Sequence, residues 1–179
     1  GGSWDDSENG LYTVTLNANQ AQSTNGQFVA GGVLGTFNVN VPFTFTGTNA
    51  DDSGPGSLRD AGEQANAKSG SVDLISFSSF FNTPQTITLL SNFPAFTEGV
   101  IVEGTSKANV IISGNSARRI FDTSATAVAT PMVFRNLTLT NGSISGSGGA
   151  INIGDEAVTV DNVTIQNSIT LTNAWVHIT

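Results

Sequence analysis

The sequence feature that most limits the fold is an internal repeat in the second half of the chain. Residues 133–141 align with residues 159–167, and the pairs Leu137/Val163 and Leu139/Ile165 keep their apolar character at that offset. The two segments also carry asparagine at the same places, 26 residues apart: Asn136 with Asn162, and Asn141 with Asn167. Short strands that recur at such an interval, without helices between them, are typical of a β-solenoid. In that fold the inward side chains form one continuous core and the turn asparagines stack along the axis.

The composition also favours strands. The 179 residues include 6 Lys+Arg and 14 Asp+Glu, so the formal net charge is −8, and charged residues make up only 11%. Ordinary soluble domains carry roughly 25%. This acidity disfavours nucleic acid or anionic lipid as a partner, because both are bound through clustered Lys and Arg. The chain has no cysteine, which excludes disulfides and thiolate metal sites. No apolar run is long enough for a membrane span.

The residues ahead of the repeat divide into two segments. Residues 1–48 read as strands and turns, with period-two alternation at 11–16 and 36–41. Glu8-Asn9-Gly10-Leu11-Tyr12, at the entrance to the first strand, resembles the tyrosine corner of immunoglobulin-like sandwiches. Too few strands fit for a whole sandwich. The segment is therefore either the end of a truncated sandwich or a short β extension packed on the next part of the chain.

Residues 49–71 contain a turn cluster and the one convincing helix, at 57–67. Ser57 is a good N-cap, and Asp60 stands three residues later in a near capping box. Gly62 lies on or beside the apolar face of this helix and should weaken it by roughly 1 kcal/mol relative to alanine. Residues 72–179 then carry the recurring strands, which we expect at 72–77, 86–90, 100–102 and 110–112 and in the two repeat segments.

Several motifs resemble one family in the right order. The opening is DSGPGSLRDA (52–61), EQANA (63–67) and DLISF (73–77); the later motifs are VIISGN (110–115), NLTLTNG (136–142) and GGAI (148–151). Together they resemble the right-handed parallel β-helix domains of large bacterial surface and secreted proteins. Residues 1–41 resemble the tail of the bacterial immunoglobulin-like modules that often precede such domains. The resemblance implies an extracellular or cell-surface location and a helix that caps the first coil. Gly62 departs from it, since a larger apolar residue is usual there, and this predicts a looser cap.

The candidates for chemistry are few. His177 is the only histidine, so no Ser-His-Asp triad or histidine-ligated metal site is expected. Parallel β-helix polysaccharide lyases or hydrolases would need grouped carboxylates, or a basic residue beside them. The candidates are Asp122, Asp155, Glu156 and Asp161, with Arg118-Arg119 as the basic pair. Asp155-Glu156 looks like a solvated turn, Asp161 an outward strand residue, and the arginine pair beside Asp122 a surface ion pair.

Calcium is the one cofactor that the sequence leaves open. Oxygen ligands in loops suit this ion, and two loops supply them: Asp5, Asp6 and Glu8 in the first, Asp51 and Asp52 in the second. Neither loop follows the twelve-residue EF-hand pattern or the Gly-rich nonapeptide pattern, and Asp52 before Ser53-Gly54 better fits an Asx turn.

The leading hypothesis for function is a non-catalytic structural or adhesive module of a bacterial surface protein, with carbohydrate or another surface protein as partner. The alternatives are a polysaccharide lyase or hydrolase and a fibre-forming subunit that assembles end to end. After Asn167 the expected Gly-Gly-containing coil is missing, and residues 168–179 are predicted to cover the last coil or pair on it. A following domain or an end-to-end copy would serve the same purpose.

Overall fold

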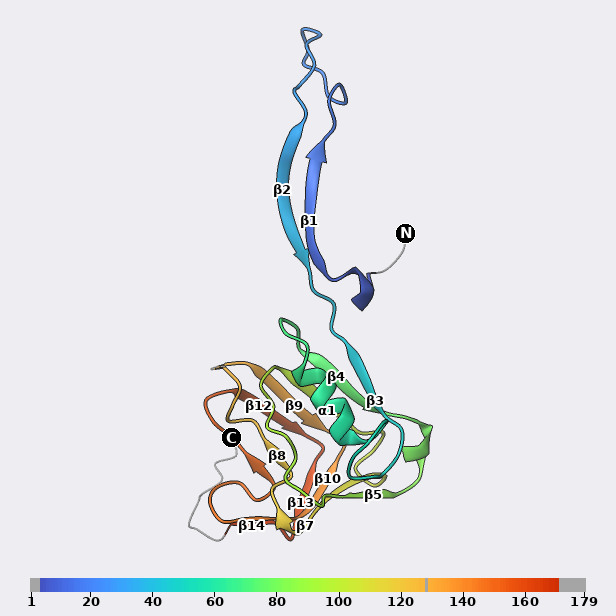
Figure 1. Ribbon diagram of the computed structural model, residues 1–179, viewed down its shortest axis with the longest axis vertical. Coiled ribbons are helices and arrows are strands. Elements are labelled where there is room, and N and C mark those ends of the chain that lie inside the picture. Colours follow the sequence, from blue (N-terminus) through green and yellow to red (C-terminus); the bar gives the residue numbers. More distant parts are fainter. Residues whose placement is uncertain (1–3, 128, 171–179) are drawn as a thin grey trace. The chain divides into compact units, whose positions relative to one another are not determined.

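The computed structural model describes residues 4–127 and 129–170 and divides into two compact units, Gly1–Val41 and Pro42–Thr179 (Figure 1). The chain is mostly β, with 41% strand and 9% helix, as its composition predicts. The described residues contain no helix long and apolar enough to cross a membrane.

The N-terminal unit is built on an antiparallel hairpin. Strands β1 (Gly10–Leu16) and β2 (Gly32–Val39) pair with each other, and a one-turn 3-10 helix, η1 (Asp6–Glu8), precedes them. The register shifts between Val14 and Thr15, so that Leu34 is an extra residue in β2. The Tyr12 hydroxyl donates a 2.9 Å hydrogen bond to the Glu8 carbonyl. The bond runs back to a backbone carbonyl four residues earlier in the chain.

Parallel strands form the C-terminal unit (Figure 1). The first sheet has the order β12-β9-β6-β4-β3, the second β13-β10-β7-β5, and the third is the pair β11-β8. The first sheet consists of β3 (Thr44–Gly47), β4 (Asp73–Phe77), β6 (Val100–Glu103), β9 (Pro131–Arg135) and β12 (Ala157–Asp161). The second consists of β5 (Gln85–Thr88), β7 (Val110–Arg118), β10 (Thr138–Ile144) and β13 (Thr164–Gln166). The third joins β8 (Phe121–Asp122) to β11 (Ile151–Asn152), while β14 (Ile169–Thr170) pairs with β10.

The register between β10 and β13 is the one that the internal repeat predicts. Thr138 lies beside Thr164, and Leu139 beside Ile165. All four repeat asparagines, at 136, 141, 162 and 167, have positive φ, between 50° and 58°. This left-handed conformation is one that asparagine tolerates better than most residues. Asn162 also donates a 2.8 Å side-chain hydrogen bond to Asn136 Oδ1, 26 residues away. The predicted asparagine ladder therefore exists at this step.

The core lies between the sheets and is rich in aromatic rings. It includes the fully buried Phe81, Phe96, Phe121 and Phe134. The rings of Phe121 and Phe134 stack with centroids 4.7 Å apart, which links the third sheet to the first.

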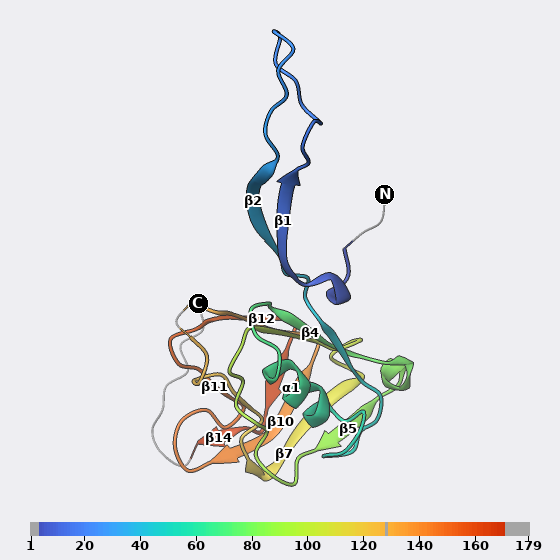
Figure 2. The same ribbon diagram turned by 45° about the horizontal axis from the view of Figure 1, so that its top comes forward.

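Helix α1 (Leu58–Asn66) confirms the predicted helix and its cap. The Ser57 hydroxyl accepts from the Asp60 amide at 3.1 Å, while Asp60 Oδ2 accepts from the Gly56 amide at 2.8 Å. The helix packs against β3 and β4 (Figure 2) and buries Leu58, Ala61 and Ala65 in the core.

The structure gives a steric reason for glycine at position 62, while the prediction of a looser cap stays a prediction. A Cβ built on Gly62 would lie 2.6 Å from Cζ of Phe93, closer than real Cβ contacts. The Phe93 ring thus occupies the space that a larger residue would fill, and Gly62 permits this contact.

The boundary between the units also differs from the predicted segment 1–48. Thr44–Gly47 pairs in parallel with β4, and the division falls between Val41 and Pro42. Alternation alone could not show this, because it does not reveal which strand a segment pairs with.

Candidate functional site

The carboxylate with the most polar partners is Asp122, at the end of β8. Its Oδ2 forms an ion pair with Arg119, and its Oδ1 accepts from the Ser124 hydroxyl at 2.7 Å and the Asn152 amide at 3.0 Å. Partial burial raises the pKa of Asp122, but the bonds from Ser124 and Asn152, followed by the charge of Arg119, outweigh it and hold the pKa below its usual value. Asp122 is therefore held ionised and is a poor proton donor near neutral pH.

The two arginines beside this carboxylate are also occupied. Arg119 donates to the carbonyl of Gly148 at 3.2 Å and to that of Ser147 at 2.8 Å, and Arg118 donates to the carbonyl of Leu90 at 3.0 Å. Both side chains tie a loop to the strands.

Glu156 differs from the predicted solvated turn. It is only 7% exposed. Its two carboxylate oxygens each accept a 3.0 Å hydrogen bond from the Gly154 amide, and Oε1 also contacts the Thr123 hydroxyl. The carboxylate thus organises the loop that leads into β12. Its neighbour Asp155 is exposed, as predicted, and so is Asp161, at the end of β12.

In the first candidate calcium loop, the carboxylates of Asp5 and Glu8 form hydrogen bonds within the loop itself. Asp5 Oδ1 accepts from the Ser7 amide at 2.9 Å and from the Ser7 hydroxyl, while Glu8 Oε2 accepts from the Asp5 amide at 3.0 Å. The Ser7 bonds lower the pKa of Asp5. The two carboxylates cap η1, and the side chain of Asp6 lies outside the described residues.

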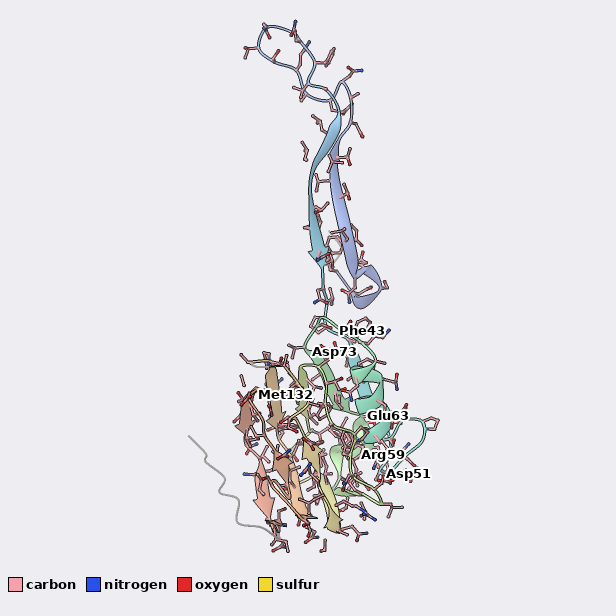
Figure 3. The ribbon with its side chains drawn as sticks, turned by 60° about the vertical axis from the view of Figure 1, so that its left-hand side comes forward. Phe43, Asp51, Arg59, Glu63, Asp73 and Met132 are labelled. Atoms are coloured by element: carbon pink, nitrogen blue, oxygen red, sulfur yellow. The ribbon has the colours of Figure 1, made fainter. Side chains whose placement is uncertain are left out.

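The second loop is split between two environments. Asp51 is exposed, whereas Asp52 Oδ1 accepts from Arg59 at 2.8 Å and from the Leu90 amide at 2.9 Å. Arg59 also donates to the carbonyls of Ser91 and Asn92, at 3.1 and 2.8 Å. Figure 3 shows Arg59 on the helix, with Asp51 in the neighbouring loop. Across the described ranges, no three His, Cys, Asp or Glu side chains converge as a metal site would require.

The sequence did not reveal two charged residues that the fold depends on. Arg59 joins α1 to the segment after β5 through the contacts with Ser91 and Asn92. Asp73, only 1% exposed, accepts at Oδ1 from the Phe43 amide at 3.0 Å and from the Ser71 hydroxyl at 2.6 Å (Figure 3). A signal for Asp73 was present, because alternation places it on the same face of its strand as Ile75 and Phe77.

The last candidates from the sequence lie near the C-terminus. His177 and the last residues of the predicted covering tail lie outside the described residues. Comparison with protein-family models, with curated proteins and with solved structures finds no match to the chain.

Proposed function

We propose that the C-terminal unit is a right-handed parallel β-helix that serves as a non-catalytic structural or adhesive module of an extracellular protein. The observation that carries this proposal is the order in which the chain visits its sheets. It runs through the first, second and third sheet as β6, β7 and β8, again as β9, β10 and β11, and then enters β12 and β13. Each strand lies parallel to its counterpart in the turn before.

The right hand follows from a general rule. Crossovers between parallel strands of one sheet are right-handed in about 98% of cases, because the twist of the strands favours that path. In this arrangement α1 caps the first coil, as solenoid ends require.

The non-catalytic role is supported by what the polar groups do. Asp122, Arg119 and Glu156, the strongest candidates for cleaving a polysaccharide, are bound to backbone groups or to one another. A reaction site would need at least one of them to face substrate with a free oxygen or proton.

The N-terminal unit supports the same kind of parent protein. Its hairpin, with the Tyr12–Glu8 bond, has the features of the last two strands of an immunoglobulin-like sandwich. Such modules act as spacers and binding surfaces, and this leaves adhesion to carbohydrate or to another surface protein as the proposed activity.

The experiment incubates the whole chain with pectate, alginate and other polyuronates and follows both product release and binding. We expect no new reducing ends and no ultraviolet absorbance from unsaturated products. Binding without cleavage supports adhesion, and neither binding nor cleavage supports a purely structural role. Turnover that Asp122→Asn abolishes, while the exposed control Asp161→Asn keeps it, would show that the chain is an enzyme.

A further inference from the structure

The chain that connects the two units is fixed on both sides of one residue, Pro42. On the N-terminal side, the Asn9 side chain binds the backbone of Val41 twice. Its amide group donates to the Val41 carbonyl at 2.9 Å, and its Oδ1 accepts from the Val41 amide. Asn9 directly precedes β1, whose pairing with β2 ends at Gly10 and Val39. The side-chain amide therefore acts like one more strand residue and holds Val41 in the ladder of the hairpin.

Phe43, on the other side of Pro42, is bound to the C-terminal unit. Its amide donates to Asp73 Oδ1 at 3.0 Å, and its carbonyl accepts from the Leu74 amide at 2.8 Å (Figure 3). Asp73 is a firm anchor, because it belongs to β4 and is buried. In addition, Nζ of Lys68 lies 4.8 Å from the centroid of the Phe43 ring, a cation–π contact. Both backbone groups and the ring of Phe43 are thus held by this unit.

These contacts leave few backbone angles free between the units. A peptide group is planar. The bond to the Val41 carbonyl therefore fixes the plane that includes the Pro42 nitrogen, and the bond from the Phe43 amide fixes the plane that includes the Pro42 carbonyl. Only φ and ψ of Pro42 lie between these two planes. The pyrrolidine ring holds φ at about −65°, so the one remaining rotation is ψ.

We infer that Pro42 is a hinge with a single axis, the Cα–C bond, about which the two units turn relative to each other. Pro42 is exposed, and proline has no amide hydrogen that could tie it to either unit. Steric limits leave ψ two favourable ranges, the helical and the extended one. The hinge therefore permits two groups of orientations. A flexible Gly/Ser-rich linker would instead permit a continuum.

A hinge of this kind affects how the two units act together. When one partner binds both units, the conformational entropy that is lost depends on how freely the units move beforehand. A single free angle keeps that loss small and also limits the distances that the two units can span. The hinge depends only on the contacts of Val41 and Phe43, so it applies to an adhesive and to a purely structural module alike.

Distances between spin labels in the two units test this inference. Because the chain has no cysteine, introduced cysteines can carry the labels at exposed strand positions: Thr36→Cys in β2, with either Thr86→Cys in β5 or Thr159→Cys in β12. Double electron–electron resonance gives a distribution of distances for each pair. We expect one or two maxima, each as narrow as that of the pair Thr86→Cys and Thr159→Cys within one unit. A single broad distribution for both pairs between the units would overturn the inference.

Two variants release the hinge in different ways. Pro42→Gly removes the ring that holds φ and should widen the distributions at least about twofold, since glycine adopts positive and negative φ alike. It leaves the contacts of both units in place. Asn9→Asp keeps the acceptor for the Val41 amide but loses the donor to the Val41 carbonyl, and should widen them as well.

The matched control is Asn38→Asp, which adds the same charge at an exposed position of β2 and should leave the widths unchanged. Widths that Pro42→Gly does not change would show that the proline ring does not limit the motion, and the single axis would be wrong. Equal widening by Asn9→Asp and Asn38→Asp would likewise contradict the role of Asn9.

Discussion

The two edges of the C-terminal unit end in different ways. At the edge formed by β3, helix α1 packs against the sheet and its apolar side chains join the core. At the edge formed by β12 and β13, the inward residues of the last strands are half exposed. Phe134 is 0% exposed, while its neighbour Val160 in β12 is 44% exposed. Leu139 and Ile165 differ in the same way, at 0% and 45%.

Inward side chains at equivalent positions of neighbouring strands form a row across each sheet. The difference shows that the place of a side chain in this row decides its burial more than its residue type does. The inward row of the second sheet runs Ile87, Ile112, Leu139 and Ile165, and only the last of them is exposed. The same row therefore contains chemically similar side chains in two environments. Substitutions along it measure what a covering layer contributes to stability.

The largest expected effect compares the two ends of that row. Ile112→Ala removes a fully buried side chain and should lower the free energy of unfolding by about 4 kcal/mol, because it leaves a cavity. Ile165→Ala, at the exposed edge, should cost less than about 1 kcal/mol, close to an ordinary surface substitution. Urea unfolding followed by circular dichroism measures both. Equal losses would mean that the β13 edge is covered in solution.

The next effect concerns how α1 is held at the covered edge. Arg59→Ala breaks the ion pair with Asp52, whose side chain is 13% exposed, and should cost about 3 kcal/mol, because it leaves a carboxylate buried without its partner. The control is Arg135→Ala, which breaks the half-exposed pair with Glu103 and should cost below about 1 kcal/mol. The same unfolding experiment compares them. A smaller loss for Arg59→Ala than for Arg135→Ala would contradict this account of the cap.

Gly62→Ala tests how closely α1 packs against Phe93, because two physical effects predict opposite changes in the free energy of unfolding. Helix propensity alone predicts a gain of roughly 1 kcal/mol. The contact between the new Cβ and the Phe93 ring predicts a loss of about 1–2 kcal/mol instead, since overpacking forces side chains out of place. Phe93→Leu in the same chain should remove most of that loss, so a thermodynamic cycle of the two variants isolates the contact. Stabilisation by Gly62→Ala alone would contradict it.

The smallest effect is the pH dependence of the third sheet. The folded pKa of Asp122 is lowered, so its contribution to stability is fully present above the unfolded pKa of about 3.9 and is lost as pH falls through the folded pKa. Stability should therefore decline below about pH 4, and Asp122→Asn should flatten that part of the profile. Melting temperatures between pH 2 and pH 7 check this. An unchanged profile in the variant would assign the acid loss to other carboxylates.

The sequence predicted those parts of the fold that depend on local chemistry. Asparagine at 136 and 162 indicated turns, and the repeated apolar pattern around them predicted which of these strands are neighbours and in which register. Ser57 and Asp60 likewise marked the start of α1. Each of these signals is contained within a few residues.

Other features depend on residues far apart in the chain and left no local signal. Gly62 reads as a weak point until Phe93 is placed against it. Glu156 reads as a solvated turn residue until the loop brings Thr123 onto its carboxylate. The two-residue strands of the third sheet are too short to show alternation. The same holds for the candidate site. The sequence shows its charged residues, but it does not show the distant groups to which they are hydrogen-bonded in the fold.

The interval of 26 residues between Asn136 and Asn162 also affects the order of events in time. A new strand finds its partner one turn earlier in the chain, so each addition closes a loop of that size at an entropic cost of roughly 3 kcal/mol. Strands β3 and β4 and helix α1 leave a ribosome or an export channel before the strands that must pair with them. They can fold first and act as the template on which later strands add. This chain is thus suited to folding in one direction, from its amino-terminal side, while the rest is still emerging.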